Sequence, residues 1–367
     1  MRGPDATQEA LFSFSSLESF VPSDHPLRTV RTLVNDSLKS LNDLFSEIYA
    51  DTGRSSIAPE KLIRALLLQV FYSVRSERQL MEQIRYNMLF RWFVGLAIDD
   101  AVWDHSVFSK NRDRLLEHEV LESFFAEVMK GADAAGLLSR EHFSVDGTLI
   151  QAWASHKSFK PRDGSDDQTP GGPGRNAQAD WKGNRHSNDT HASTTDPDAR
   201  LYRKSHNSAS IMAYQGHVLM ENRSGLVVGA VVTHADGLGE RAAALAMLDA
   251  IPKSPTRTVG ADKAYDTQDF IANCRERGVT PHVARNDSAR RSAIDGRTTR
   301  HAGYGLSQIS RKRIEEHFGW GKTVGRIRQT VYRGIGRVDQ HFKLTMTASN
   351  LIRMARMLQV VPQGAAR

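Results

Sequence analysis

The sequence predicts a mixed α/β protein, in which helices cover a sheet of parallel and antiparallel strands, preceded by an all-α N-terminal domain. Apolar residues recur at helical spacing from about residue 26 to 135. At Phe143 the pattern changes to extended runs. A hairpin and then alternating helices and strands follow, which is typical of a mixed sheet with helical layers. We therefore expect a helical domain at residues 1–140, an α/β domain at 141–357 and a tail at 358–367.

The N-terminal helices begin at recognisable signals. The run 59–71 starts with Pro59, a residue suited to a first helical turn, and apolar residues follow at helical spacing. Ser76 is followed three residues later by Gln79, which is the pattern of a capping box at the start of another helix. Helices joined by short turns therefore account for this part of the chain.

The C-terminal part contains an antiparallel start followed by alternating elements. Two β-rich runs, 209–220 and 225–233, flank a turn and predict a hairpin. The elements expected after it are a helix at 239–251, a strand at 256–262, a helix at 266–277, a strand at 279–283 and a helix at 311–322. Residues 155–207 interrupt this order with a long polar insertion, in which 158–190 is expected to lack regular structure.

The composition narrows the class of protein. Residues 281–367 hold 17 Lys and Arg against 5 Asp and Glu, whereas the net charge of the whole chain is +7. A basic C-terminal quarter suits a polyanion such as nucleic acid, although an Arg-rich solvated surface gives the same count. One cysteine, Cys274, excludes a disulfide or a Cys-based zinc site within the chain. No apolar run is long enough to span a membrane, so we expect no membrane partner.

Three acidic residues on three expected elements are the candidate site. Asp146 lies in an extended run, Asp262 ends a second one, and Glu315 lies in the last helical run. Carboxylates converging at one sheet edge can hold a pair of Mg²⁺ ions, and such a pair can cut and rejoin a phosphodiester backbone. Each residue also has an ordinary explanation. Asp146 suits a turn, Asp262 suits a helix N-cap and Glu315 suits a solvated helix.

The helix that carries Glu315 presents a chemically unusual face. At about 100° per residue, Arg311, Gly319 and Lys322 share one face with Glu315. An acid, two cations and a bare glycine can hold a metal ion, grip phosphates and admit a backbone. The alternative is a solvated helix with an ion pair between Arg311 and Glu315.

These motifs resemble those of the DDE transposases of bacterial insertion sequences, specifically the insertion-sequence-five family. The first Asp stands in Val145-Asp-Gly-Thr148, and the second in Gly260-Ala-Asp-Lys-Ala-Tyr-Asp266. Arg311, Glu315 and Lys322 follow the family pattern of Arg, three residues, Glu, six residues, Lys. Related elements carry a Tyr three residues before this Arg, and here that position is Gln308. The similarity covers residues 15–357.

The resemblance implies a ribonuclease-H-like fold and a two-metal reaction on DNA. Asp146, Asp262 and Glu315 are then the catalytic residues and the ligands of two Mg²⁺ ions, for which Mn²⁺ substitutes. The implied partners are the element's inverted-repeat ends and the target DNA, bound by a homodimer or higher oligomer. The implied location is the bacterial cytoplasm, at the nucleoid. Arg311 and Lys322 are expected to hold DNA phosphates.

Three further residues are candidates for DNA contact. Trp153 can stack on an unpaired base, although a tryptophan in the core is the commoner arrangement. Arg326 and Arg328 extend the basic region and suit phosphates. Two other functions remain open: an inactive relative that only binds element ends, and a metal-dependent nuclease without strand transfer.

Overall fold

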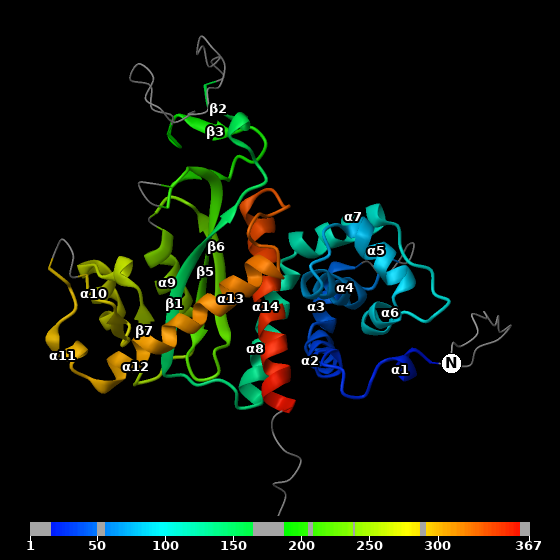
Figure 1. Cartoon of the computed structure of the whole chain (residues 1–367), viewed down its shortest axis with the longest axis horizontal. Coiled ribbons are helices and arrows are strands. Elements are labelled where there is room, and N and C mark those ends of the chain that lie inside the picture. The colour runs from blue at the N-terminus through cyan, green and yellow to red at the C-terminus, as the bar shows by residue number, and fades with distance from the viewer. Residues whose placement is uncertain are drawn as a thin grey trace, which may run out of the picture.

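The structure is a computed structural model of the chain, and it describes residues 16–49, 56–163, 187–204, 208–237, 239–286 and 291–359. Helices gather on one side of the molecule and a sheet with its own helices on the other, and the long C-terminal helix stands between them (Figure 1). The arrangement confirms the predicted fold class, a mixed α/β sheet with flanking helices preceded by a helical region.

The described part of the N-terminal region contains eight helices. They are α1 (Leu17–Phe20), α2 (Leu27–Lys39), α3 (Asn42–Ile48), α4 (Pro59–Phe71), α5 (Glu77–Tyr86), α6 (Met88–Val94), α7 (His105–Glu117) and α8 (Val120–Ala134). The prediction of a helix at 59–71 is confirmed to the residue. The predicted helix start at Ser76 is confirmed as well, because Ser76 Oγ accepts from the backbone N–H of Gln79 at 3.2 Å. The reciprocal bond of a capping box is shifted by one residue, because Gln79 Oε1 accepts from Arg75 N at 3.3 Å.

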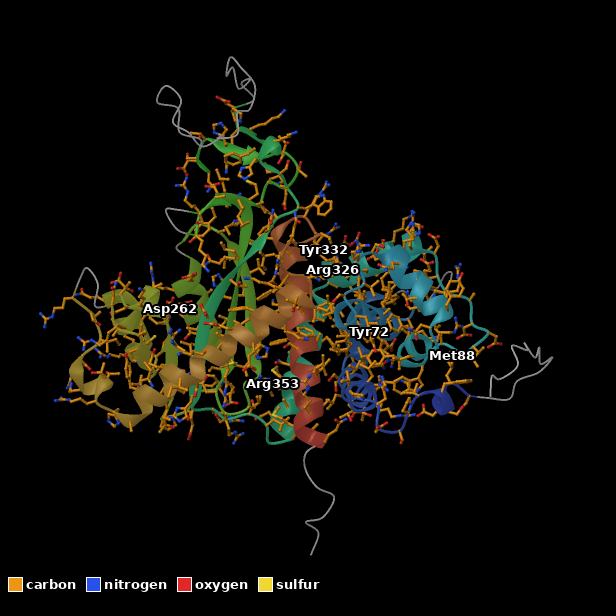
Figure 2. The ribbon with its side chains drawn as sticks, viewed as in Figure 1. Tyr72, Met88, Asp262, Arg326, Tyr332 and Arg353 are labelled. Carbon is orange, nitrogen blue, oxygen red and sulfur yellow. The ribbon has the colours of Figure 1, made fainter. Side chains whose placement is uncertain are left out.

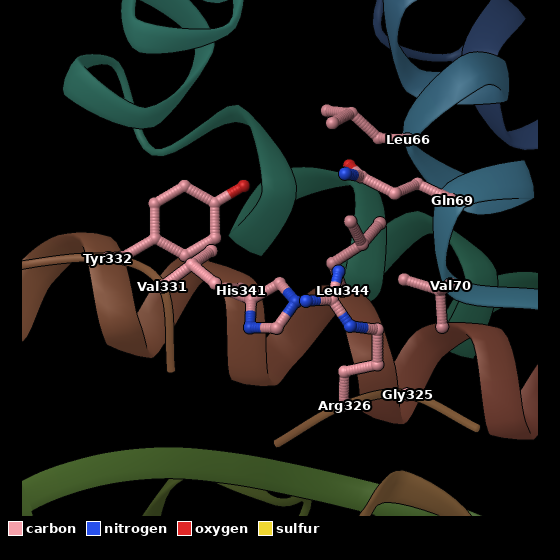
Figure 3. Close-up of a pocket in the computed structure, with 9 residues that line it drawn as sticks. All are labelled: Leu66, Gln69, Val70, Gly325, Arg326, Val331, Tyr332, His341 and Leu344. Carbon is pink, nitrogen blue, oxygen red and sulfur yellow. The ribbon is translucent and has the colours of Figure 1, made fainter. Parts of the chain in front are cut away.

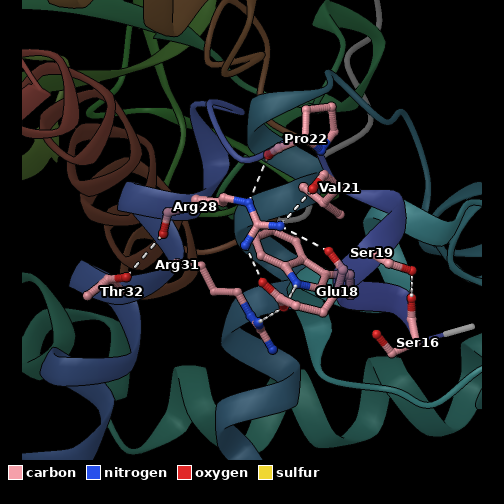
Figure 4. Close-up of polar contacts among 9 residues, drawn as sticks. Ser16, Glu18, Ser19, Val21, Pro22, Arg28, Arg31 and Thr32 are labelled. Atoms are coloured by element: carbon pink, nitrogen blue, oxygen red, sulfur yellow. Dashed lines mark hydrogen bonds and ion pairs between the residues drawn. The ribbon is translucent and has the colours of Figure 1, made fainter.

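A polar network around Arg28 connects the first described helix, α1, to its neighbours (Figure 4). Glu18 on α1 accepts from Trp92 Nε1 at 2.6 Å and pairs with Arg28 on α2. Arg28 also donates to the carbonyls of Val21 and Pro22. The guanidinium of Arg31 lies over the Trp92 ring at 4.5 Å from its centroid. These contacts join α1, α2 and α6.

The central sheet combines antiparallel and parallel pairs. Its strands are β1 (His142–Gln151), β4 (Arg200–Tyr202), β5 (Ile211–Glu221), β6 (Val227–His234), β7 (Thr258–Ala261) and β8 (Thr280–Val283). The order across the sheet is β6-β5-β1-β7-β8, and β4 pairs with the beginning of β5. The predicted hairpin is confirmed as the antiparallel pair β5–β6. β7 and β8 run parallel to β1, and this order is that of a ribonuclease-H-like sheet.

Helices cover both faces of this sheet. One face carries α9 (Gly239–Ala250) and α10 (Gln268–Glu276), whose apolar residues pack with Phe143 and Val145 of β1. The other face carries α13 (Ile314–Thr323) and α14 (Ile335–Gln359), which pack with Ile150. Because side chains alternate along a strand, Asp146 shares the face of Ile150, and Gly147 faces α9.

The last helices approach the sheet in a broken line. α11 (Gly296–Thr299) and α12 (Ala302–Ser310) are followed by a 3₁₀ turn at Arg311–Arg313 and then by α13. The predicted helix at 311–322 is therefore present, with its first turn tightened. α12 and α13 both lie against β1, and α13 crosses in front of the sheet in Figure 1.

The helix α14 joins the two parts of the chain. Its buried side chains belong to the same apolar cluster as those of α2, α4 and α8 and of the adjoining sheet face. Asn350 binds the backbone N–H and C=O of Val227 at 2.9 and 2.7 Å, and Lys343 pairs with Glu122 on α8. The helices and the sheet therefore share a core, and the division at residues 140 and 141 stays a prediction.

The insertion contains short regular elements in its described part. They are a 3₁₀ turn (His156–Ser158), β2 (Phe159–Pro161), β3 (His191–Ser193) and the strand β4 of the central sheet, and β2 and β3 pair antiparallel. Regular structure therefore reaches into 158–190, where none was expected. Residues 164–186 and 205–207 of the insertion lie outside the described residues. Within the described ranges, no helix is long and apolar enough to cross a membrane.

Candidate active site

The first aspartate lies where two parallel strands separate. β1 pairs with β7 only from His142 to Ser144, so beyond Ser144 this side of β1 has no strand partner in the described chain until Gln151. Asp146 follows within this opening. Its Oδ1 accepts from the N–H of Gly147 at 2.7 Å, and its Oδ2 has no hydrogen-bond partner among the described residues. One carboxylate oxygen is thus free to bind a ligand.

The second aspartate follows the strand on the far side of the opening. Asp262 is the residue after β7, and it caps a 3₁₀ turn (Lys263–Tyr265) by accepting from Ala264 N at 2.8 Å. The N-cap considered as its ordinary explanation is therefore present. It uses only Oδ1, so Oδ2 also lacks a hydrogen-bond partner in the described part of the chain. Figure 2 places Asp262 beside the sheet.

Electrostatics connect the two aspartates. The pKa of Asp146 is raised to about 6, chiefly by burial and also by the charges of Asp262 and Glu240, while the Gly147 hydrogen bond and Arg311 act to lower it. The carboxylates of Asp146, Asp262 and Glu240 have no ion-pair partner among the described residues. Carboxylates that are half-buried, close together and unpaired favour a cation between them.

Two basic residues of the predicted helix face lie near Asp146. The charge of Arg311 lowers the pKa of Asp146. The charge of Asp146 acts to raise the pKa of Lys322, which favours the charged form of that lysine. Arg311 Nε donates to Gln308 Oε1 at 3.1 Å, and the Gln308 amide donates to the carbonyl of His282 at 2.5 Å. Gln308, which stands where related elements have Tyr, therefore orients this arginine.

Glu315 is exposed on the same helix, and its carboxylate makes no contact with either aspartate. The ion pair with Arg311, considered as its ordinary explanation, does not form within 4.0 Å. Its neighbour Glu316 pairs instead with Arg353 of α14, which Figure 2 labels. A β-carbon at Gly319 would meet nothing within 4 Å, so this face is open.

The aspartates fit a divalent metal, although the full ligand set is not assembled. Mg²⁺ prefers oxygen ligands and is commonly held by one or two carboxylates. Asp146 and Asp262 each offer a free oxygen, and their mutual repulsion is relieved by a cation. In the described ranges, no group of three His, Cys, Asp or Glu side chains converges closely enough to hold a metal. A third carboxylate must therefore move toward the pair.

Trp153 and Arg328 lie at the end of β1. Trp153 is 51% exposed, so the alternative of a core tryptophan is wrong. The carbonyl of Arg328 accepts from Gln151 N at 3.0 Å, which fixes residue 328 beside the strand end. The side chain of Arg328 is exposed and near enough to Lys322 to lower the pKa of that lysine. Arg328 therefore borders the end of the opening, and Trp153 lies two residues beyond β1.

Arg326 lies in a different environment from Arg328. Its backbone has a φ of +61°, and its guanidinium donates to the carbonyl of Val74 at 2.8 Å. Figure 3 shows it in a pocket between α4 and α14, facing His341 and Leu344. Burial lowers the pKa of Arg326. The side chain of Arg326 therefore connects the loop before α14 to the N-terminal helical region.

Sequence reasoning missed one acidic residue near the aspartates, Glu240. It lies in the first turn of α9, and its charge acts on Asp146, as noted above. The available signal was the strand facing it, because Gln215 and His217 are polar residues within an otherwise apolar run. Buried polar residues in a central strand require partners, and Glu240 is the partner of Gln215.

Comparison with known families decides the class of the protein. Residues 15–114 match the model described as "Transposase domain (DUF772)", and residues 139–351, more than half of the chain, match "Transposase DDE domain". The chain belongs to the DDE transposases of insertion-sequence type. It is therefore an enzyme that acts on DNA, and its family implies a divalent metal. No curated protein sequence matches the chain.

Solved structures of other transposases show distant likeness. A piggyBac transposase synaptic complex with hairpin DNA has a TM-score of 0.43 at 9% identity, covering 91% of this chain and 76% of that chain. A Mos1 transposase paired-end complex with the left transposon end has a TM-score of 0.21 at 9% identity, covering 85% and 95%. Likenesses this distant carry no argument about this transposase.

Proposed function

We propose that this DDE transposase, as a member of the insertion-sequence-five family, cleaves DNA at terminal inverted repeats and joins the ends to target DNA. The observation that carries the proposal is the opening between β1 and β7. There Asp146 and Asp262 each keep a free carboxylate oxygen beside the cations Arg311 and Lys322. Metal-dependent cleavage of a phosphodiester requires carboxylates that bind the metal ions and cationic side chains that bind the phosphate.

The two aspartates hold the metal ions in this proposal, together with Glu315. A pair of Mg²⁺ ions held there, or Mn²⁺ in their place, would supply the Lewis acidity that activates a water or 3′-OH and stabilises a leaving oxygen. Asp146 lies on the central strand, and its Oδ1 bond to Gly147 N fixes the direction of the free oxygen. Asp262 is fixed in the same way by Ala264 N. Glu315 joins them from α13 by a side-chain movement on the open helix face.

Cations around the opening hold the DNA backbone. The pKa of Lys322 is lowered chiefly by burial and then by the positive charges of Lys204 and Arg328. Lys204, Lys322 and Arg328 are therefore close enough to repel one another. A phosphate between them relieves that repulsion, because each phosphate contact of a Lys or Arg replaces a counterion. Arg311 points into the same region under the control of Gln308. These residues position the strand whose bond is broken.

The exposed end of β1 receives the DNA flanking the scissile bond. Trp153 offers an exposed ring face on which an unpaired base can stack, and Arg328, whose carbonyl binds Gln151 at the strand end, has an exposed side chain for phosphate contact. Arg326 has a weaker claim to DNA contact, since its guanidinium already binds the Val74 carbonyl. Two ends must be held together for joining, so the working form is a homodimer or higher oligomer at the nucleoid in the bacterial cytoplasm.

The test is a reaction in vitro on supercoiled DNA that carries both flanks of the gene's own locus, with Mg²⁺ present. Cleavage at the flanks together with joined products is the expected result. Asp262→Asn should abolish both products, whereas Asp269→Asn, an exposed carboxyl on α10, should retain them. Cut ends without joined products would replace the proposal with a nuclease, and binding without cleavage would replace it with an inactive end-binding relative.

The role of Glu315 has a matched control in the next residue. Glu315→Gln should lower the rate of cleavage by at least about a hundredfold, because it removes a charge that acts on the transition state. Glu316→Gln should leave the rate within about twofold, because that carboxylate is engaged by Arg353. Equal rates in the two variants would remove Glu315 from the catalytic set.

A further inference from the structure

The opening that holds the two aspartates also has a border on the α9 side of the sheet. Glu240 lies there and accepts a hydrogen bond from the Gln215 amide. A β-carbon placed on Gly147 would lie 3.2 Å from Glu240 Oε1 and 3.1 Å from His217 Nδ1. The Glu240 carboxylate therefore rests against the residue that follows Asp146, in space that a side chain at Gly147 would occupy.

A second glycine sets the start of α9 at this position. A β-carbon on Gly239 would lie 2.7 Å from Thr233 Oγ1 of β6, which is closer than such atoms approach. The hydroxyl of Thr233 in turn contacts His217 Nε2 at 2.8 Å. Glycine at 239 lets the first turn of α9 lie directly on the sheet, and Glu240 is carried with it toward β1.

Among the described residues, no cation lies within 4.0 Å of the carboxylates of Asp146, Asp262 and Glu240, the three acidic groups near the opening. The pKa of Glu240 is raised chiefly by burial and then by the charge of Asp262. The charge of Glu240 in turn raises the pKa of Asp146. Arg241 and Lys204 oppose the rise at Glu240, but in the described part of the chain neither lies within 4.0 Å of the carboxylate. Like charges held together without a cation are unfavourable, so the arrangement favours a bound one.

Buried polar atoms without partners point to the same place. The Tyr265 hydroxyl is on a side chain that is 1% exposed, and it has no hydrogen-bond partner among the described residues. Tyr265 ends the 3₁₀ turn that Asp262 caps, and burial together with the charges of Glu240, Asp146 and Asp262 raises the pKa of its hydroxyl well above the ordinary value. His217 Nδ1 and Gln215 Oε1 are likewise buried and unpartnered.

Such a group of atoms is uncommon in a folded protein. Buried polar groups are ordinarily hydrogen-bonded, and an unsatisfied one costs about 1–3 kcal/mol. Three of them border Glu240 or its neighbouring carboxylates, and none belongs to the Asp–Asp–Glu set of the proposed reaction. A hydrated cation would supply charge to the carboxylates and hydrogen bonds to these atoms.

We propose that Glu240 is a fourth carboxylate of the divalent-ion centre, which it reaches from the α9 side of β1 through the opening beyond Ser144. This inference rests on the proposed placement of the ions at Asp146 and Asp262. Glu315 approaches from the α13 face, so the two glutamates meet the aspartates from opposite faces of the sheet. Gln215 is the positioning residue, since its amide fixes the Glu240 carboxylate.

The inference is tested by Mn²⁺ binding to the full-length protein without DNA, measured by calorimetry and by electron paramagnetic resonance of free Mn²⁺. Glu240→Gln should raise the Kd for Mn²⁺ at least about tenfold, as changes beside a metal site do. It should leave the metal-free melting temperature unchanged or higher, because a like charge is removed from the group. Glu276→Gln, an exposed carboxyl at the end of α10, should bind Mn²⁺ as the wild type does.

The outcomes separate this inference from the proposed function. If Asp146→Asn weakens Mn²⁺ binding and Glu240→Gln does not, Glu240 serves only as the acceptor for Gln215 and the inference is overturned. If neither variant changes binding, the placement of the ions at Asp146 is wrong, and the inference fails with it. Should Glu240→Gln not fold, Glu240→Asp decides: a shortened carboxylate should weaken Mn²⁺ binding, and wild-type affinity would overturn the inference.

Discussion

Replacing Asp146 with Asn should make the metal-free transposase more stable at neutral pH while removing its activity. The change keeps the shape of the side chain, and the Asn Oδ1 can still accept from Gly147 N, which lies 2.7 Å from the Asp oxygen. It removes a negative charge that burial and two neighbouring carboxylates disfavour. Active sites are places where stability and function oppose each other in this way.

The size of the effect follows from the pKa of the carboxyl. A value of about 6 in the folded protein against 3.8 for the free group means that ionisation opposes folding, by about 3 kcal/mol above pH 6. The sign follows from the same difference: below pH 3.8 the carboxyl is protonated in both states and the cost vanishes. At pH 5 about half of the cost remains. For a chain of this length, about 3 kcal/mol corresponds to a rise of about 4 °C in the melting temperature.

The assay is thermal unfolding in EDTA at pH 8 and at pH 5, for the wild type and Asp146→Asn. The difference in stability should be about twice as large at pH 8. Asp24→Asn, in an exposed turn, serves as the control and should shift stability by less than about 0.5 kcal/mol. A variant that is less stable than the wild type at pH 8, or a gain independent of pH, would refute the reasoning.

Three further predictions concern the surroundings of the site. Gly147→Ala should destabilise the protein by about 1–3 kcal/mol in urea unfolding, since the new β-carbon meets the Glu240 carboxylate; unchanged stability would mean that this space is empty. Arg328→Gln should weaken DNA binding in a gel-shift titration without changing the melting temperature, whereas Arg326→Gln should lower stability by about 1–3 kcal/mol; the reverse pattern would exchange their roles. Tyr214→Phe should lower the free energy of unfolding by about 1.5–3 kcal/mol in chemical denaturation, because the Tyr214 hydroxyl donates to the buried carboxylate of Asp196 at 2.7 Å; an unchanged free energy would contradict that bond.

Local signals in the sequence were sufficient for the elements that carry the site. Helix α4 begins at Pro59 and ends at Phe71 as expected, because the proline and the apolar period act within a few residues. The hairpin β5–β6 was likewise readable from two β-rich runs and a turn. The positions of Asp146 within a strand and of Asp262 at the end of another followed from the same kind of local pattern.

Contacts between distant segments were not readable in this way. Arg326 and Arg328 are equivalent as sequence, yet one binds the carbonyl of Val74, which precedes it by 252 positions, and the other is exposed. Trp153 could belong to a core or to a surface, and only its position after the end of β1 decides for the surface. In each case the environment depends on which remote segment packs beside the residue.

The sequence by itself determined the α/β class, the order of elements and the carboxylates and cations of the candidate site, because periodicity and turn residues act locally. Only the tertiary structure decided that β1 and β7 separate after Ser144, that Glu315 is still remote from the aspartates, and that Glu240 borders them from the other face. The physical reason is that β1 and β7 pair between residues about 116 positions apart, as His142 and Thr258 do. The register of such a pairing is set by the packing of the whole sheet, and no local pattern contains it.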